Sequence, residues 1–149
     1  MKIRTSIAAA GAAVVLAGTG ALLLPAVASA HSTTHTLKFT AVTMTPQAKF
    51  SSTSFGQAEK DLNSAGKVIG YDVINVEFNP TTNTATGAVS LSTNGGMLYG
   101  ALKFTGTSSV VHGTITGGTG AFKGATGTIT GTQNKAGTRT AVTITYTTP

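Results

Sequence analysis

The stretch "GGTGAFKGATGTITG", Gly117 to Gly131, has two possible interpretations: a phosphate-binding loop, or a corner between two β-strands. A glycine-rich phosphate loop presents free backbone N–H groups in front of a helix N-terminus. The dinucleotide-binding pattern places its third glycine five positions after its first, whereas here the spacing from Gly118 to Gly124 is six, and no Gly-Lys-Ser/Thr follows. The residues after Gly124, "ATGTITGTQ", alternate threonine with alanine, glycine or isoleucine. This period of two predicts a strand, so we interpret the stretch as a glycine corner between strands.

The first thirty residues have the pattern of a secretory signal peptide. Lys2 and Arg4 precede a long apolar stretch, and Ala28-Ser29-Ala30 is a small-residue cleavage site. The apolar stretch is long enough to span a bilayer, so a retained anchor is the alternative. We predict a signal peptide at 1–30 and a secreted, extracellular domain at 31–149, with no stable membrane span after cleavage. The absence of cysteine from the sequence excludes a lipoprotein.

Charge and composition exclude further classes. Without Lys2 and Arg4, eight basic residues remain against four acidic ones, a net charge of +4 for the mature chain. These charges are scattered and do not form the basic stripe of a nucleic-acid-binding protein, so no nucleic-acid partner is expected. Because there is no cysteine, disulfides cannot contribute, and stability must come from packing and a closed ladder of hydrogen bonds.

The mature chain is predicted to be all-β. Turn signals such as Asn79-Pro80 and Asn94-Gly95-Gly96 separate short alternating segments, and "QAEKDLNSAG" at 57–66 is predicted to be a loop or a single turn. The expected strands are 36–44, 47–55, 66–78, 84–93, 96–105, 107–117, 121–132 and 138–147. Short, regularly spaced strands of this kind indicate an antiparallel sandwich or barrel.

The side-chain alternation favours a closed barrel. Leu98, Leu102 and Phe104 share one face of their strand, and Val142, Ile144 and Tyr146 share one face of the last strand, which is typical of a sheet with one dry face. Glycines recur on the inward face, where they relieve crowding in a tightly coiled sheet. They are Gly87, Gly100, Gly113 and Gly127. Since closure removes exposed edges, we predict an eight-stranded antiparallel β-barrel.

The segment 66–78, "GKVIGYDVINVEF", is apolar on both faces over part of its length. Its outer face carries Ile69, Tyr71 and Val73, and we predict a homo-oligomer, such as a trimer, that packs through this face. Asp72 belongs to the inward face, where burial would raise its pKa and make it a candidate proton donor or base. The alternative is a structural carboxylate satisfied by threonine hydroxyls or backbone N–H groups at the rim of the barrel.

Three blocks carry a resemblance to a known superfamily. "GKVIGYD" at 66–72, "GMLYGALKFTG" at 96–106 and "ITGGTGAFKGATGTI" at 115–129 resemble the allene oxide cyclase-like and dirigent-like barrels. The resemblance covers 36–147 and implies an eight-stranded antiparallel barrel, commonly trimeric, with an apolar cavity. It also implies chemistry without a cofactor: the cyclases close an epoxide fatty acid into a cyclopentenone, and the dirigent proteins guide the coupling of phenoxy radicals.

The family's functional residues carry over poorly to this chain. The first strand, "TLKFTAVTM", lacks the carboxylate that the family often has there, and the cavity cysteine of the cyclases is missing. Tyr71 stands after Gly70, where dirigent proteins have arginine. Asp72 is the acidic residue that remains within a resembling block at a plausible cavity position.

Metal and hydrolase chemistry find less support. Histidines occur at His31, His35 and His112, too few and too separated for a metal site. One alternative is that cleavage after Ala30 exposes His31 as an N-terminal residue that chelates copper with a second histidine. No serine occupies a nucleophile turn. We therefore expect no metal and no cofactor.

Two functions of different class follow. In the first, an apolar cavity binds a small hydrophobic molecule and steers a cofactor-independent cyclisation, isomerisation or stereoselective coupling, with Asp72 as the catalytic residue. In the second, the barrel is a non-catalytic extracellular ligand-binding or interaction module. The residues predicted to bind the ligand are Phe39, Leu98, Leu102, Phe104, Val142 and Tyr146.

Overall fold

The computed structural model describes residues 32–44, 47–106 and 108–149. The predicted signal peptide and His31 lie outside these residues. Within the described part there are nine strands and one short 3₁₀ helix, η1. Their bounds are β1 Thr33–Thr43, β2 Ala48–Lys49, β3 Ser54–Leu62, β4 Val68–Asn79, β5 Thr84–Thr93, β6 Gly96–Thr105, β7 Val110–Gly118, η1 Gly120–Phe122, β8 Thr126–Gln133 and β9 Arg139–Thr148. A search of the described residues finds no helix of the length and apolar character needed to cross a membrane.

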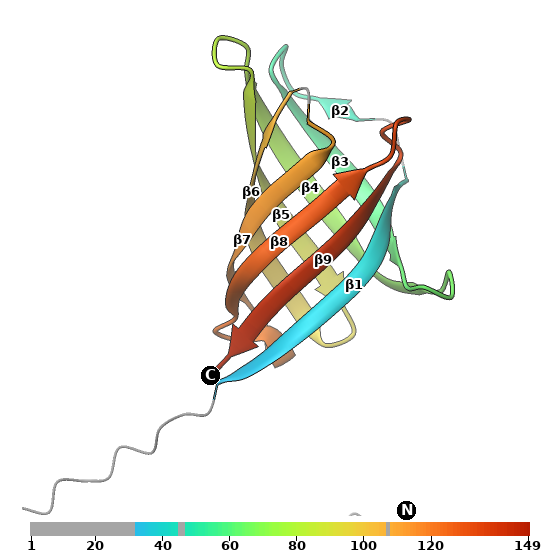
Figure 1. Cartoon of the computed structure of the whole chain (residues 1–149), viewed down its shortest axis with the longest axis vertical. Helices are drawn as coiled ribbons and strands as arrows, with labels where there is room; N and C mark the ends of the chain where they lie inside the picture. Colours follow the sequence, from blue (N-terminus) through green and yellow to red (C-terminus); the bar gives the residue numbers. More distant parts are fainter. Residues whose placement is uncertain (1–31, 45–46, 107) are drawn as a thin grey trace, which may run out of the picture.

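The strands form one closed antiparallel barrel, which confirms the predicted fold class (Figure 1). Neighbours along the chain pair with each other from β3 to β9, and β1 pairs with β9. The second half of β1 also pairs with β3, from Thr40 opposite Leu62 to Thr43 opposite Glu59, and this pairing closes the barrel. The two-residue β2 pairs with the first half of β3, at Gly56 and Phe55. Eight strands therefore form the wall and β2 is an addition to it.

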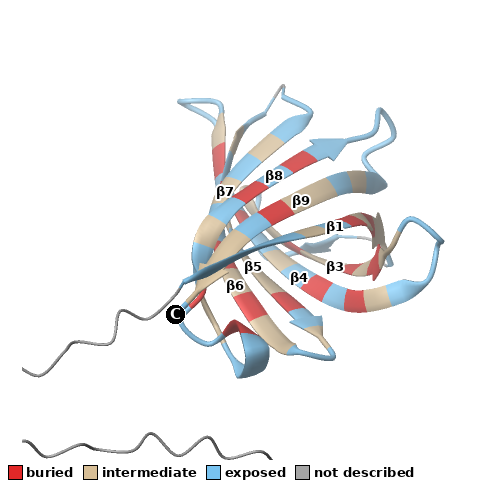
Figure 2. Ribbon diagram, turned by 60° about the horizontal axis from the view of Figure 1, so that its bottom comes forward, coloured by how far each residue is buried: buried red, intermediate tan, exposed pale blue. Residues whose placement is uncertain are grey.

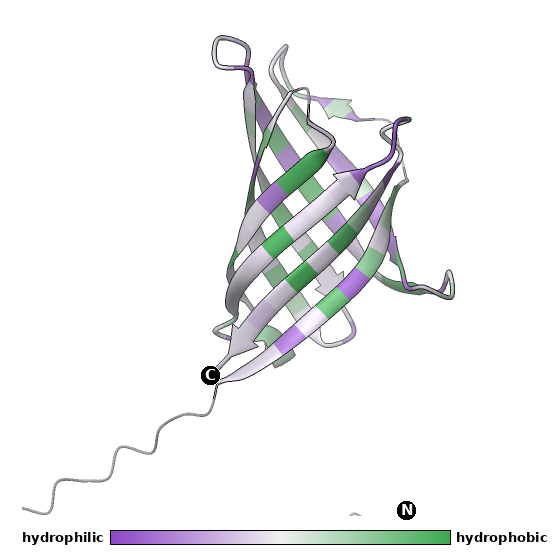
Figure 3. Ribbon diagram, in the orientation of Figure 1, coloured by the Kyte–Doolittle hydropathy of each residue, from purple (hydrophilic) through white to green (hydrophobic). Residues whose placement is uncertain are grey.

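Side chains alternate between a dry interior and a wet exterior, as the sequence predicted. Figure 3 shows apolar and polar positions alternating along β8, β9 and β1, and Figure 2 shows buried and exposed positions following one another in the same way. The buried core cluster consists of Phe39, Ala41, Leu91, Leu98, Leu102, Ile115, Phe122, Ala125, Ile129 and Ile144. The interior is crowded: a Cβ atom on Gly100 would lie 2.6 Å from Ile129 Cδ1 and 3.0 Å from Val89 Cγ1. Glycine at this position therefore lets the coiled wall approach the core.

The glycine corner between β7 and β8 folds back onto the β5–β6 hairpin. The backbone N–H groups of Thr119 and Ala121 donate to Met97 O and Gly95 O, each at 2.8 Å. Phe122 donates to Thr119 O at 3.0 Å and is itself buried. Because these N–H groups are occupied within the protein, the interpretation of the stretch as architecture is confirmed. The single strand predicted at 121–132 is wrong in its first part, where η1 and a turn precede β8.

The strand predicted at 47–55 is also wrong. Only Ala48–Lys49 within that range forms an extended pair before a turn, and the long strand β3 occupies Ser54–Leu62, where a loop was predicted. The inward positions of β3 include Gln57, Glu59 and Asp61, which are polar. The sequence therefore lacks the apolar alternation that normally reveals a half-buried strand.

Strand β4 has the predicted face orientation over most of its length. Gly70, Asp72 and Val76 are buried, whereas Tyr71 and Val73 are 52% and 48% exposed. Ile69 differs from the prediction, because it packs against the core cluster and not on the outer face. The β3–β4 register shifts between Asp61 and Leu62 and leaves Ile69 outside the ladder. A bulge of this kind turns the side chains before it to the opposite faces.

Candidate functional site

A cavity of about 240 Å³ lies inside the barrel. The mouth of the cavity lies at the end of the barrel that carries β2, and η1 lies at the other end (Figure 1). The lining residues that are exposed at this mouth are Gln47, Thr105, Gly106, Ser108 and Gln133. Ligand pockets for drug-sized molecules measure about 300–1,000 Å³. The size of this cavity therefore suits a molecule of two or three fused rings better than a long fatty acid.

The apolar side of the cavity contains most of the predicted ligand-binding residues. Phe39, Leu98, Leu102, Phe104 and Val142 all line it. They come from β1, β6 and β9, so closure of the barrel brings together residues that are far apart in the sequence. The result is an apolar wall that surrounds most of the cavity.

Tyr146 does not line the cavity. Its side chain is directed into the barrel and packs against the core cluster, but its ring lies between two other rings. His35 stacks on it with 5.2 Å between ring centroids, and Phe122 meets it edge-on at 5.5 Å. Tyr146 therefore belongs to the packed end of the barrel beside η1, and its predicted role in ligand contact is not supported by its position.

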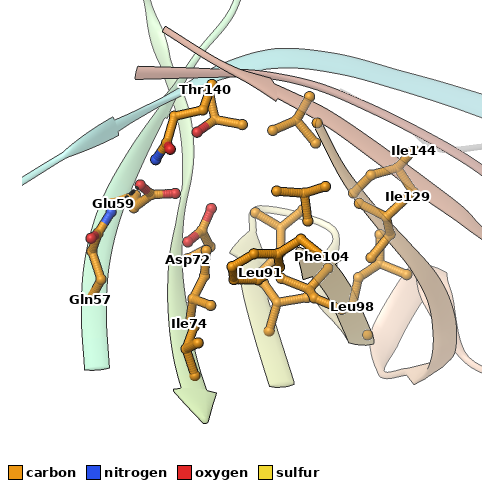
Figure 4. A pocket seen from close by; sticks show the side chains of 18 of the residues that line it. Gln57, Glu59, Asp72, Ile74, Leu91, Leu98, Phe104, Ile129, Thr140 and Ile144 are labelled. Carbon is orange, nitrogen blue, oxygen red and sulfur yellow. Dashed lines mark hydrogen bonds between the residues drawn. The ribbon is translucent and has the colours of Figure 1, made fainter. Parts of the chain in front are cut away.

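A polar wall faces the apolar one (Figure 4). Gln57 and Glu59 of β3 and Asp72 of β4 line this side of the cavity, with Glu59 directly opposite Asp72 in the β3–β4 ladder. Asp61 lies two residues further along β3 and is completely buried. The sequence identified Asp72 but missed Glu59 and Asp61. A period-two pattern of polar residues, Gln57-Glu59-Asp61, was the signal that could have revealed them.

Glu59 is held by a short chain of side-chain hydrogen bonds. Gln57 Nε2 donates to Glu59 Oε1 at 2.6 Å and to Thr43 Oγ1 at 2.9 Å, and Thr43 Oγ1 donates to the same carboxylate at 3.4 Å. Gln47 Nε2 at the mouth donates to Gln57 Oε1 at 3.2 Å. Burial raises the pKa of Glu59, and the hydrogen bonds from Gln57 and Thr43 oppose this rise. The chain of amides thus connects the mouth of the cavity to the carboxylate.

Asp61 and Asp72 form a pair of neighbouring carboxyl groups. The pKa of Asp72 is raised to about 8, mainly by burial; the charges of Asp61 and Glu59, and a hydrogen bond from the protonated Asp72 to Asp61, contribute to the same rise. Burial also raises the pKa of Asp61 to about 6, against the hydrogen bond from Asp72. As two carboxylates, both Asp61 oxygens and Asp72 Oδ1 would lack a partner among the described residues. A proton on Asp72 supplies that partner, so the pair shares one proton near neutral pH.

The arrangement can hold and transfer a proton at the cavity surface. Asp72 lines the cavity and Asp61 lies beside it in the wall, so Asp72 can exchange a proton with a bound molecule while Asp61 fixes its protonation. Tyr99 also lines the cavity, and its hydroxyl group donates to Met97 Sδ at 3.6 Å. In the part of the chain that the structure describes, no group of three or more His, Cys, Asp or Glu residues is placed to hold a metal ion.

The two histidines that the structure describes lie at different places on the barrel. His112 lies exposed on β7, opposite Lys103 and Thr130 in the neighbouring strands. His35 stacks on Tyr146 at the other end of the barrel. The copper alternative needs His31 as the N-terminal residue, and His31 lies outside the described residues, so that alternative stays a prediction.

No family model and no curated protein matches this chain. Solved structures do match it. A Diels–Alderase from Streptomyces koyangensis shares 11% identity over 82% of this chain and 72% of its own, with a TM-score of 0.64. A pyocyanin demethylase shares 16% identity over 75% of this chain and 99% of its own, with a TM-score of 0.61. A pterocarpan synthase dirigent protein shares 17% identity over 80% of this chain and 85% of its own, with a TM-score of 0.53.

At these identities the likeness concerns the fold alone. The shared feature is a barrel fold like the one that the sequence predicted for this chain. The class that fold and site define is a small closed antiparallel barrel with an internal cavity, lined by an apolar wall and a carboxyl wall.

Proposed function

We propose that the barrel binds a small, largely apolar molecule in its cavity and transfers a proton to or from it through Asp72, so that a cyclisation, isomerisation or coupling follows one geometry. The observation that carries this proposal is the position of Asp72, a buried carboxyl group on the surface of an apolar cavity. Proton transfer by a positioned group with a pKa near the working pH is efficient in both directions. The fixed apolar walls would restrict the conformers that the bound molecule adopts.

The relatives in fold support the general class. A Diels–Alderase, a demethylase and a dirigent protein are all named for reactions or couplings of small molecules. The signal-peptide pattern of residues 1–30 supports an extracellular place of action. If the Asp72→Asn variant binds ligand but retains all product selectivity and rate, Asp72 has no chemical role and the barrel is a binding module.

Filling part of the cavity near its mouth should weaken ligand binding. Thr140 lies on β9 and lines the cavity, whereas Thr145 is exposed on the same strand. We expect the neutral dye N-phenyl-1-naphthylamine to bind the wild type saturably with increased fluorescence. The Thr140→Trp variant should bind at least tenfold more weakly because the indole fills part of a small cavity, and Thr145→Trp should bind as the wild type does. A wild type without saturable binding, or equal binding by both variants, would contradict the proposed cavity site.

We also propose that copies of the chain associate through the outer face of β4. Tyr71 and Val73 project from this face and remain half exposed, as expected for apolar side chains that pack on a partner. In sedimentation velocity the wild type should be oligomeric, and the double variant Tyr71→Lys, Val73→Lys should be monomeric with an unchanged circular dichroism spectrum. A monomeric wild type at moderate concentration would reject this interface.

A further inference from the structure

We propose that the cavity selects hydrophobic monocations, molecules in which one or two apolar rings carry a quaternary or protonated nitrogen, and that this nitrogen lies against Asp72 and Glu59. The inference rests on the proposed binding function and specifies its ligand class. It follows from the charges inside the barrel, the unpartnered carboxylate oxygen and the separation of polar and apolar walls.

The interior carries negative groups without positive ones. Glu59, Asp61 and Asp72 are 3%, 0% and 5% exposed. Among the described residues that line the cavity, none is lysine, arginine or histidine. Lys60 stands between two inward residues of β3, so it belongs to the outer face. The three carboxyl groups therefore have no internal counter-ion within the described part of the barrel.

The carboxyl cluster also contains an oxygen with no partner. Asp72 Oδ1 is buried and accepts no hydrogen bond from the described residues, although Asp72 lines the cavity. A buried carboxylate is costly unless it is paired. Glu59 differs because Gln57 and Thr43 already donate to it. A positive group at the cavity surface beside Asp72 would stabilise the ionised carboxyl group in place of the proton shared with Asp61, whereas a neutral hydrocarbon would leave that proton on the pair.

The two walls of the cavity match an amphiphilic cation. Figure 4 shows Gln57, Glu59 and Asp72 on one side, and Leu98, Ile129 and Ile144 on the other. A flat ring system can pack on the apolar side while a nitrogen at its edge approaches the carboxyl side. Opposite charges at about 4 Å attract strongly when water is largely excluded. The cavity volume of about 240 Å³ restricts such a ligand to a few rings.

Binding of a cation should also displace the proton shared by Asp61 and Asp72. The titratable groups facing Asp72 are Glu59 and Asp61, both from β3. The neighbouring positions on β1 and β5 are Thr43, Ala41 and Leu91, and those across the cavity on β9 are Thr140 and Val142, none of which titrates. Tyr99 is the remaining ionisable residue of the lining. A ligand charge beside Asp72 favours the ionised form of that carboxyl group, so protons should leave the pair upon binding.

The test compares two probes of the same shape, 1-methylquinolinium and 1-methylnaphthalene. The first is a permanent cation and the second is neutral at every pH, so neither titrates. Both compete at pH 8 against N-phenyl-1-naphthylamine bound to the full chain. We expect the cation to bind at least tenfold more tightly than the neutral probe. Equal affinities, or a preference for the neutral probe, would overturn the inference.

Three variants test whether the preference for the cationic probe comes from the carboxyl wall of the cavity. Asp72→Asn and Glu59→Gln should each reduce the ratio of the two affinities several-fold, because each removes one negative charge beside the ligand. Glu77→Gln removes a charge from the exposed face of the same strand as Asp72 and should keep the wild-type ratio. If Glu77→Gln lowers the affinity ratio as much as Asp72→Asn does, the preference for the cation depends on the net charge of the protein. That result would contradict a local site. If neither probe displaces the dye and the dye itself does not bind, the proposed function has failed independently of this inference.

Proton release provides a second readout. Calorimetric titrations at pH 7.5 in two buffers of different ionisation enthalpy measure how many protons leave the protein upon binding. We expect 1-methylquinolinium to release a measurable fraction of a proton and 1-methylnaphthalene to release none. In Asp61→Asn the release should fall, since the acceptor that shares the proton is gone. Proton release that is equal for both probes would contradict a charge–charge contact at Asp72.

Discussion

The Asp61→Asn variant should unfold at a higher temperature than the wild type at pH 8, and at nearly the same temperature at pH 5. Burial raises the pKa of Asp61 to about 6 and that of Asp72 to about 8, from an ordinary value of 3.8. The folded protein therefore binds more protons than the unfolded chain between about pH 4 and pH 8. Its stability is complete at the low end of this window and is lost as pH rises through the folded pKa values.

The expected size follows from the same linkage. For each proton that the folded protein binds in excess of the unfolded chain, the free energy of unfolding changes by about 1.4 kcal/mol per pH unit. Above about pH 6 the ionisation of Asp61 lowers the free energy of unfolding. Asparagine at this position does not ionise, so this loss of stability disappears, and the asparagine amide can donate a hydrogen bond to Asp72. A gain on the order of 2 kcal/mol at pH 8 corresponds to a rise in Tm of about 10 °C for a domain of this size.

Thermal unfolding at pH 5, 6.5 and 8 measures this effect. Glu77→Gln is the matched control, because it removes the same charge from the exposed face of β4 and should show no pH-dependent gain. An Asp61→Asn protein that is destabilised equally at all three pH values would show that Asp61 is needed as a hydrogen-bonding carboxylate. That result would also contradict the sharing of a proton by Asp61 and Asp72.

The sequence predicted the parts of the barrel whose inward residues are apolar. The ranges 84–93 and 96–105 agree with β5 and β6, and the inward positions Leu98, Leu102 and Val142 line the cavity. Apolar alternation reports burial directly, because the interior of such a barrel is dry. The same alternation placed Asp72 correctly on the inward face of β4, because Gly70 and Val76 of that strand also point inward.

The sequence failed where the interior is polar or the chain leaves the regular ladder. Strand β3 was missed because its inward residues are the very carboxyl groups that form the site. Ile69 was assigned to the wrong face because a bulge cannot be read from alternation alone. Tyr146 has the predicted direction, but the ring of Phe122, brought in by η1, occupies the space beside it. Each of these outcomes depends on a contact between distant segments.

The carboxyl wall is a local departure from the rules that stabilise the rest of the barrel. Elsewhere the inward side chains are mostly apolar, whereas Asp61 is fully buried without an N–H or hydroxyl donor among the described residues. Buried groups with perturbed pKa values concentrate at functional sites, where stability is lower than packing alone would allow. This contrast connects the predicted gain in stability of Asp61→Asn with the proposed proton transfer at Asp72.

The Gly118→Ala variant should be severely destabilised, by about 3 kcal/mol or more. Gly118 ends β7 at the glycine corner, and a Cβ atom there would lie 2.6 Å from Phe122 O, 2.7 Å from Met97 O and 2.7 Å from Phe122 Cβ. Two of these atoms belong to backbone that is fixed by the hydrogen bonds of η1 and the β5–β6 hairpin, so the corner has to move as a unit. Overpacking against backbone destabilises more than contact with a mobile side chain. Thermal unfolding at pH 5, where the carboxyl pair is protonated, isolates this effect.

Gly95→Ala provides the matched control, because Gly95 lies in the β5–β6 hairpin onto which the corner folds. A Cβ atom on Gly95 would meet Phe122 Cε2 at 3.4 Å and Ala121 Cβ at 3.5 Å, which are ordinary van der Waals distances. Its Tm should stay within a few degrees of the wild type, while that of Gly118→Ala should fall by about 10 °C or more. Loss of the packing between Phe122 and Tyr146 should also weaken the near-ultraviolet circular dichroism of the tyrosine in Gly118→Ala only. Equal unfolding temperatures for the two variants would mean that the corner yields easily, and that the glycine pattern does not set the closed end of the barrel.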